Sequence, residues 1–285
     1  MTEPYGAGWS ATLRRGTDAE LRGWVDAALV WCDAADEIAL RHFRRGITVS
    51  RKPDRTFVTE ADTGVERLIR DRIAAAYPDH GVIGEELGSD ADGASVRWYL
   101  DPIDGTHNYI RGVPLFATLL AAERDGELQA AVVSAPALGS RWYAWRGGGA
   151  WALDRASSEP RRIAVSRIDR IDEAQVLYAG TVDVEGSGRA PGFRGLLAEA
   201  WRERGFGDFW GYCLVAEGSA EAMVEVDLQV WDAAAPTLIV EEAGGRVTDF
   251  DGRRGLDGKT FLATNGILHE RLRARLLDID GGRDR

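Results

Sequence analysis

Trp98-Tyr-Leu-Asp101-Pro-Ile-Asp104-Gly-Thr-His-Asn108 is the stretch of sequence that decides how this chain is interpreted. The apolar run Val96 to Leu100 predicts a strand that leads into two aspartates. Pro102 cannot donate a hydrogen bond to a continuing strand, so we expect the chain to turn there. Such a turn directs both carboxylates and the Ile103 carbonyl toward one point.

The residues that follow are suited to holding a phosphate group. Gly105 permits close approach of the backbone, and Thr106 supplies a hydroxyl. If a helix begins at Gly105 or Thr106, its free N–H groups face the same point as the carboxylates. Helix N-termini bind anions through such groups, so the segment predicts a phosphate site.

Two further acidic positions extend this pattern. Glu85 follows the predicted strand Gly81 to Gly84, and Asp232 begins a predicted helix. With Asp101 and Asp104 they form an all-oxygen ligand set, which suits Mg²⁺, Mn²⁺ or Ca²⁺ better than Zn²⁺. Taken singly, such residues more often cap a helix or lie in a solvated turn. Two or three divalent cations and a phosphate dianion would balance the four charges.

Hydrophobic periodicity predicts an α/β protein with layered sheets and helices. The N-terminal part combines two long helices with antiparallel strands, whereas strands and helices alternate from about Ile163. We therefore expect two subdomains, 1–160 with most metal ligands and 161–285 with Asp232 and the substrate pocket. The helices are expected over 17–43, from Asp62 to Tyr77, 193–204, 212–217 and 232–243. The strands are expected over 81–84, 96–100, 115–122, 128–134, 141–145, 150–153, 175–179, 222–226 and 246–249.

Composition excludes several classes of protein. The 285 residues carry a net charge of −11, which is unfavourable for general nucleic-acid binding. The sequence has no apolar run of transmembrane length, and residues 1–16 resemble a loose leader without a signal-peptide core. Only Cys32 and Cys213 are present, which fits a reducing cytoplasm. We expect a cytoplasmic protein that binds neither nucleic acid nor membrane.

Four blocks, in this order, resemble the inositol monophosphatase-like family of metal-dependent phosphatases. The resemblance covers about residues 21–276. It implies an αβαβα sandwich and Mg²⁺-dependent hydrolysis of a small phosphate monoester by a metal-activated water. The blocks are Lys52 with Val58-Thr-Glu-Ala-Asp62, Gly84-Glu-Glu86, Asp101-Pro-Ile-Asp-Gly-Thr106, and Trp231-Asp232 with Glu241-Glu-Ala-Gly-Gly245.

The resemblance also implies a role for each residue of the site. Glu85, Asp101 and the Ile103 carbonyl would hold one metal ion. Asp101, Asp104 and Asp232 would hold a second, and a third would lie near Glu85, with Mn²⁺ as the alternative to Mg²⁺. Thr106 and Asp62 would orient the attacking water together with Glu85. The N–H groups of Gly105 and Thr106 would hold phosphate oxygens, and the loop with Lys52 either covers the site or is an ordinary surface hairpin.

Within the family, the sequence is most similar to the histidinol-phosphatase branch. The similarity lies in Asn108 to Pro114, Ser134 to Leu138 and Gly207 to Glu217. His107 stands where that branch often has lysine, so it is either a contact of the substrate phosphate or a surface helix residue.

Asp208 and Glu225 align with the region that would receive the organic part of the substrate. Two carboxylates there favour the cationic histidinol over neutral inositol, although Asp208 is also explained as a helix cap.

The sequence therefore leaves three functions open. The first is histidinol-phosphate hydrolysis in histidine biosynthesis. The second is hydrolysis of inositol, sugar or nucleotide phosphates, which uses the same metal ligands. The third is a non-catalytic regulatory protein, against which the intact ligand set argues. Ten tryptophans and the habit of the family favour a homodimer.

Overall fold

The computed structural model describes residues 17–46, 48–51, 57–154, 157, 159–256 and 258–278. The expected leader, most of the C-terminal tail and Lys52 lie outside these residues.

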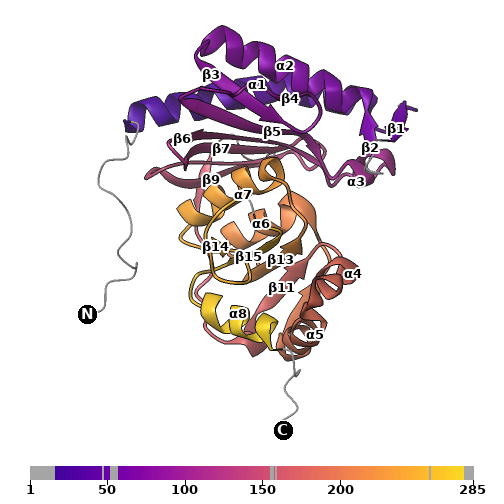
Figure 1. The fold of residues 1–285 in the computed structure, drawn as a ribbon, viewed down its shortest axis with the longest axis vertical. Helices are drawn as coiled ribbons and strands as arrows, with labels where there is room; N and C mark the ends of the chain where they lie inside the picture. Colours follow the sequence, from indigo (N-terminus) through magenta and orange to yellow (C-terminus); the bar gives the residue numbers. More distant parts are fainter. Residues whose placement is uncertain are drawn as a thin grey trace.

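The chain folds into five layers (Figure 1). Helices α1 (Asp18–His42) and α2 (Glu60–Ala76) cover the outer face of a large sheet. Helices α6 (Asp208–Ala216) and α7 (Val230–Glu242) lie between this sheet and a smaller one. The outer layer of the smaller sheet contains α4 (Thr181–Val184), α5 (Ala190–Glu199) and α8 (His269–Leu277). This is the αβαβα sandwich that the sequence resemblance implied.

The large sheet has eight strands in the order β10-β9-β8-β7-β6-β5-β3-β4. Neighbouring strands are antiparallel except for the parallel pair β3 and β5. A two-residue turn at Asp125 and Gly126, both with positive φ, joins β6 to β7 as predicted. The strands are β3 (His80–Gly84), β4 (Gly88–Ser89), β5 (Val96–Asp104), β6 (Ala117–Arg124), β7 (Glu127–Ala135), β8 (Ser140–Trp145), β9 (Gly149–Asp154) and β10 (Arg161–Ile163).

The expected turn at Pro102 is wrong. Strand β5 continues to Asp104, and its pairing with β6 is interrupted between Asp101 and Asp104. This irregularity accommodates a proline that lacks an N–H, while the Thr118 hydroxyl donates a hydrogen bond to the Pro102 carbonyl at 2.9 Å. The strand therefore presents both aspartates at its end without turning.

The smaller sheet has the order β12-β11-β13-β15-β14. The expected helix over 193–204 is wrong at its C-terminal end, because residues from Arg202 leave the helix and pair in parallel with β11. Strand β15 was not predicted, because a short apolar run buried in a sheet lacks alternation. The strands are β11 (Gln175–Tyr178), β12 (Arg202–Arg204), β13 (Ala222–Val226), β14 (Arg246–Thr248) and β15 (Thr260–Thr264).

Short elements complete the fold, and most helix starts lie slightly before the predicted ones. Helix α6 begins at Asp208 rather than Tyr212, and α7 begins at Val230. The remaining elements are β1 (Val49–Arg51), β2 (Phe57–Thr59), α3 (Thr106–Ile110), η1 (Ile171–Glu173) and η2 (Glu185–Arg189).

An aromatic cluster fixes the two outer helices on the large sheet. Trp24 and Trp31 of α1 contact Trp98 of β5, with ring centroids 6.2 and 5.5 Å apart. Tyr77, at the end of α2, stacks on His80 at 4.7 Å. Such contacts add to the burial of large apolar rings. They hold α2 against β3 and β5, the strands that lead to the predicted site.

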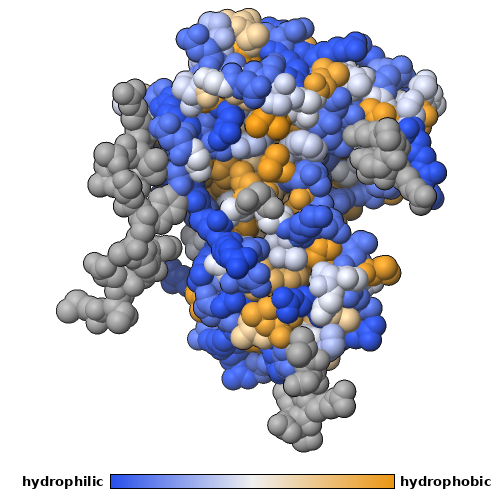
Figure 2. Space-filling view, viewed as in Figure 1, coloured by the Kyte–Doolittle hydropathy of each residue, from blue (hydrophilic) through white to orange (hydrophobic). Residues whose placement is uncertain are grey.

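Figure 2 shows a mainly hydrophilic face, with small groups of hydrophobic residues in the middle of the view, between the large sheet and the layers below it. Within the described residues, no helix combines the length and apolar character needed to cross a membrane.

Candidate active site

Three aspartates meet at one end of β5, two of them close together in the sequence and the third more than a hundred positions further along. Asp101 and Asp104 come from that strand, and Asp232 comes from the first turn of α7. One carboxylate oxygen of each lies within 4.8 Å of the others. Because α7 packs beneath the large sheet, its N-terminus reaches the end of β5 (Figure 1). The predicted convergence of these three residues is therefore present.

Backbone N–H groups orient all three carboxylates. Asp101 accepts a hydrogen bond from Ile103 N at 2.9 Å, and Asp232 accepts one from Gln229 N at 2.8 Å. Asp104 accepts one from Phe209 N at 2.9 Å, which ties the end of β5 to α6. Carboxylates fixed in this way lose little freedom when they bind a ligand.

Crowding makes the charged forms of these residues unfavourable. Burial raises the pKa of Asp101 well above its usual value, and the charges of Glu85 and Asp104 raise it further. Burial, followed by the charges of Asp208 and Asp232, does the same to the pKa of Asp104. Burial also raises the pKa of Asp232 to about 6. An anionic, all-oxygen group of this kind fits a hard divalent cation, which would relieve the repulsion.

Glu85 lies beside this cluster. It follows β3, and its backbone N–H donates to the carbonyl of Leu100 at 3.2 Å, so its position is set by the parallel pairing of β3 and β5. Its charge raises the pKa values of Asp62, Asp101 and Asp232. The group of three aspartates within 4.8 Å does not include it. Glu85 is thus electrostatically part of the cluster but lies at its edge.

Thr106 and Asp62 come together as predicted, although 44 positions separate them. The Thr106 hydroxyl lies 3.0 Å from the Ile103 carbonyl and 3.5 Å from Asp62 Oδ1, and its single proton can serve one acceptor at a time. Asp62 is fully buried in the first turn of α2 and accepts hydrogen bonds from the N–H, at 2.8 Å, and the hydroxyl of Thr59. Burial raises the pKa of Asp62 to about 6, although the bonds from Thr59 oppose the shift.

A short helix begins at Thr106, as the sequence allowed. Gly105 precedes it with φ of 80°, a conformation that favours glycine. A Cβ at this position would lie 2.8 Å from the Leu115 carbonyl oxygen. Glycine is therefore required here both by backbone conformation and by space.

Asp208 and Glu225 form a second acidic group beyond Asp104. The charge of Asp208 raises the pKa values of Asp104 and Glu225, so the two groups interact. Asp208 is the first residue of α6 and has φ of 51°, while Gly207 occupies the cap position, so the cap explanation for Asp208 is wrong. The side-chain amide of Asn108 donates to Asp208 at 3.0 Å. No local signal predicted this contact, because 100 positions separate the two residues.

Glu225 is buried on β13 with a carboxylate oxygen, Oε2, that has no hydrogen-bond partner. The buried hydroxyl of Tyr212 lies next to Glu225, and the interaction between them lowers the pKa of Glu225. Burial and the charge of Asp208 raise the pKa of Glu225 to about 8. A buried polar atom without a partner is uncommon in proteins, and here Oε2 of Glu225 indicates a place for a polar ligand.

His107 is exposed on α3, and its ring meets the ring of Phe57 edge-on at 5.4 Å. Its charge lowers the pKa of Asp208, which opposes the effect of burial. His107 is therefore a surface helix residue that faces the second acidic group.

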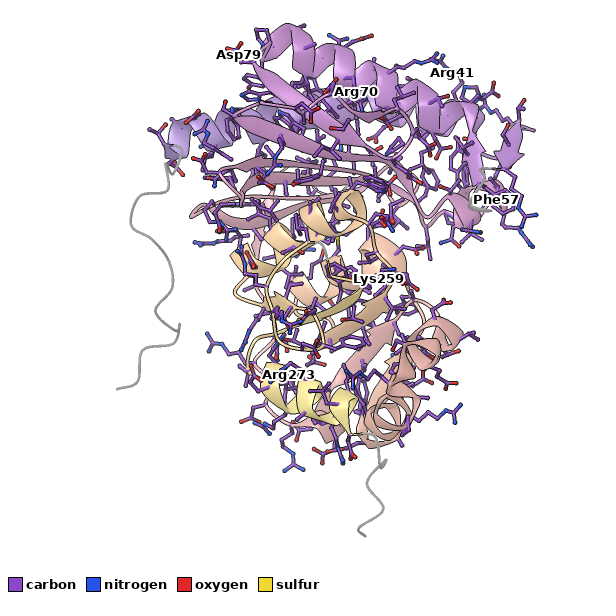
Figure 3. The ribbon with its side chains drawn as sticks, in the orientation of Figure 1. Arg41, Phe57, Arg70, Asp79, Lys259 and Arg273 are labelled. Atoms are coloured by element: carbon purple, nitrogen blue, oxygen red, sulfur yellow. The ribbon has the colours of Figure 1, made fainter. Side chains whose placement is uncertain are left out.

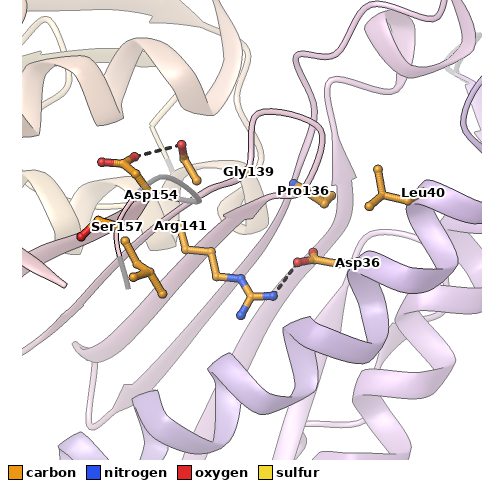
Figure 4. A pocket seen from close by; sticks show the side chains of 9 residues that line it. Asp36, Leu40, Pro136, Gly139, Arg141, Asp154 and Ser157 are labelled. Atoms are coloured by element: carbon orange, nitrogen blue, oxygen red, sulfur yellow. Dashed lines mark hydrogen bonds and ion pairs between the residues drawn. The ribbon is translucent and has the colours of Figure 1, made fainter. Parts of the chain in front are cut away.

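A cavity of about 410 Å³ lies elsewhere, between α1 and the ends of β7 to β9 (Figure 4). None of the predicted site residues lines it. Arg141 occupies its wall and is paired with Asp36 at 2.5 Å.

Comparison with known proteins agrees with this geometry. The model of the inositol monophosphatase family matches residues 20–279. A histidinol-phosphatase of Mycobacterium tuberculosis is 42% identical over 87% of this chain and 96% of its own. A histidinol-phosphatase of Streptomyces coelicolor is 44% identical over 86% of this chain and 93% of its own.

Solved structures share the fold. An inositol monophosphatase of Thermotoga maritima has a TM-score of 0.80 and 30% identity over 90% of this chain and 98% of its own. A structure described as an IMPase/NADP phosphatase complexed with Mg²⁺ and phosphate has a TM-score of 0.76 over 90% of this chain and 95% of its own, and at 20% identity it shows the fold alone. The chain belongs to the inositol monophosphatase family of phosphatases, as the sequence predicted.

Proposed function

We propose that this protein hydrolyses histidinol phosphate to histidinol and phosphate. The observation that carries the proposal is the position of an acidic pair, the partly buried Asp208 and the buried Glu225, next to the cluster of three aspartates. The cluster suits the phosphate end of the substrate, and the acidic pair suits a cationic organic end. The relatives named histidinol-phosphatase support the same substrate.

Magnesium is the cofactor that these residues fit best, with two or three ions in the site and Mn²⁺ as the alternative. Glu85, Asp101 and the Ile103 carbonyl would hold one ion, and Asp101, Asp104 and Asp232 would hold another. When bound, Mg²⁺ would neutralise the carboxylates, make a water molecule more acidic and stabilise negative charge on the leaving oxygen.

The chain's own groups would position the reactants. Asp62 is buried with a pKa of about 6, so it is ionised at neutral pH and can receive a proton through the hydroxyl of Thr106. The N–H groups of Gly105 and Thr106 lie at the start of α3, where they would hold phosphate oxygens.

Substrate selection would rest on Glu225, Asp208 and Tyr212. An ammonium or imidazolium group placed among them would donate a hydrogen bond to the partnerless Oε2 of Glu225. It would also favour the ionised form of Glu225. A charge-assisted hydrogen bond of this kind contributes about 1.5–3 kcal/mol, which is enough to dominate selectivity.

One observation favours a second class of substrate. Glu225 has a pKa of about 8 without a ligand, so it is largely protonated at neutral pH. A protonated carboxyl group can donate to a neutral hydroxyl and accept from another. Inositol, sugar or nucleotide phosphates therefore remain the alternative.

A substrate panel with Mg²⁺ tests the proposal. Histidinol phosphate should give a higher kcat/KM than inositol 1-phosphate or a nucleoside bisphosphate. Glu225→Gln keeps the shape of the side chain but removes its charge, and we expect it to reduce kcat/KM for histidinol phosphate by roughly 10- to 100-fold. Inositol 1-phosphate should lose much less in this variant. A higher kcat/KM for inositol 1-phosphate in the unmodified protein would exclude the first substrate.

Three other expectations stay predictions. These are the homodimer, the cytoplasmic location and the division into subdomains at about residue 160. Gel filtration with light scattering tests the homodimer directly.

A further inference from the structure

We propose that Glu66 is a positioning residue, which holds the loop that carries Glu85 so that the Glu85 carboxylate reaches the metal cluster. The inference rests on the proposed metal-dependent function. Glu66 lies in α2, and its side chain is fully buried. Its carboxylate accepts hydrogen bonds from the backbone N–H groups of Glu86, at 2.8 Å, and Leu87, at 3.0 Å.

Arg70 completes this support from the same helix (Figure 3). Its Nε lies 2.9 Å from Oε1 of Glu66, and its Nη1 lies 3.0 Å from the carboxylate of Asp90. Its other terminal nitrogen donates a hydrogen bond to the Gly88 carbonyl. Glu66 therefore binds the N–H groups of the loop, while Arg70 binds its carbonyl and satisfies the Glu66 charge.

The fit against the loop is tight. A Cβ at Gly84 would lie 2.1 Å from Oε1 of Glu66 and 2.9 Å from a terminal nitrogen of Arg70. On its other side, Glu85 is held through its backbone N–H by the Leu100 carbonyl. Strand β5 thus holds the backbone N–H of Glu85 itself, and α2 holds the N–H groups of the two residues that follow it.

The same helix supports a second part of the site. Asp62 lies one turn before Glu66, and it faces Thr106. Residues four apart in a helix lie on the same face. One face of α2 therefore sets the relative positions of the Asp62–Thr106 pair and the Glu85 loop.

The negative charge of Glu66 is essential for this role. Both backbone partners are donors, and so is Arg70. A glutamine would direct its NH₂ group at one of these donors and would leave Arg70 without its counter-charge. The loop would then loosen without any change to a metal ligand.

Calorimetric titration with Mn²⁺ alone tests the inference. We expect Glu66→Gln to weaken Mn²⁺ binding by roughly 10- to 100-fold, the range typical of groups that orient metal ligands. The Mg²⁺ concentration for half-maximal activity should rise by a similar factor, while kcat at saturating Mg²⁺ recovers. Asp71→Asn removes one exposed charge from the same helix, so it serves as the control and should change neither value.

A double-mutant cycle with Glu85→Gln decides whether Glu66 acts through Glu85. If it does, adding Glu66→Gln to Glu85→Gln weakens Mn²⁺ binding no further. Unchanged Mn²⁺ affinity in a folded Glu66→Gln protein, or an equal loss in the Glu85→Gln background, would overturn the inference. If Glu66→Gln does not fold, Arg70→Lys replaces it, with a smaller weakening expected and unchanged affinity as the contrary result. Because Mn²⁺ binding is measured without substrate, a wrong substrate assignment does not affect the test.

Discussion

Burial shifts the pKa values of Asp101 and His269 in opposite directions, because in each case the charged form loses its hydration. At Asp101 the neighbouring carboxylates add to the shift, and a cation is needed to balance them. At His269 the neutral ring is already satisfied, since its two nitrogens each lie 2.9 Å from a hydroxyl, of Thr248 and Thr264. Asp101 therefore needs a bound cation to balance its charge, whereas His269 already has hydrogen-bond partners from the protein and needs no ligand.

The stability of the protein should depend on the protonation of His269. Burial, with the charges of Arg246 and Arg273, lowers its pKa from 6.5 to about 4, and only Glu270 opposes this shift. The unfolded chain therefore binds a proton at higher pH than the folded one. Stability from His269 is complete above about pH 6.5 and is lost as the pH falls toward 4, by about 3 kcal/mol in all.

Denaturant unfolding of the wild type and His269→Gln at pH 7.5 and pH 5 measures this contribution. The free energy of unfolding should fall less between these pH values in the variant. An equal fall in both proteins would show that His269 does not titrate differently in the folded state.

At the scale of elements, close approach of backbones decides which glycines are needed. Helices α5 and α8 touch at Gly192, where a Cβ would lie 2.4 Å from the carbonyl oxygen of Arg275 and 2.7 Å from that of Leu276. Gly195 lies in the same helix with nothing within 4 Å of a Cβ. The two glycines therefore provide a matched pair.

Gly192→Ala should destabilise the protein by about 1–3 kcal/mol, because the added methyl group separates the two helices. Gly195→Ala should stabilise it by up to about 1 kcal/mol, since alanine is the better helix former. Thermal and denaturant unfolding of both variants measures these changes. Two shifts of the same sign and size would contradict the close contact of α5 with α8.

At the scale of the whole molecule, α7 connects the two sheets and brings Asp232 to β5. Its other end is fixed by Arg146, whose Nη1 lies 3.1 Å from Glu241 and 3.4 Å from Glu242. Arg254 lies 2.6 Å from Glu241 on the same side. Metal binding at Asp101, Asp104 and Asp232 would join β5 of the large sheet to α7, the helix that lies between the two sheets.

Mg²⁺ should raise the melting temperature of the protein, because the folded state gathers carboxylates that the unfolded chain keeps apart. At about 100 times its dissociation constant, a ligand of the folded state stabilises it by about 2.7 kcal/mol. Removal of divalent ions with EDTA should reverse the shift. Differential scanning fluorimetry with and without Mg²⁺ measures it.

Asp101→Asn is the matched variant for this measurement. It should have the higher melting temperature without metal, because one buried charge is gone, and a much smaller response to Mg²⁺. Its phosphatase activity should fall by at least about 100-fold, the loss expected when several kcal/mol of charge stabilisation disappear. Full activity in this variant would refute the assignment of the metal ligands.

Local patterns in the sequence were sufficient for much of the fold. The apolar stripe of α1, the turn at Asp125 and Gly126, and the start of α3 depend on residues within a few positions of each other. The order of the acidic motifs likewise identified the family and the three aspartates that converge. Errors arose where long-range pairing decides the outcome, as at Arg202, which joins a sheet instead of continuing a helix.

Only the tertiary structure decided how the site is supported. Asn108 holds Asp208 across 100 positions, and Glu66 holds the Glu85 loop across about 20. Neither contact has a local signature, because each forms only when separate elements pack and a long segment of chain is closed. The sequence by itself determined which groups carry the chemistry, because the residue types and the spacing of the acidic motifs identify them. The packing of α2, α6 and α7 around β5 determined where those groups lie and what holds them there.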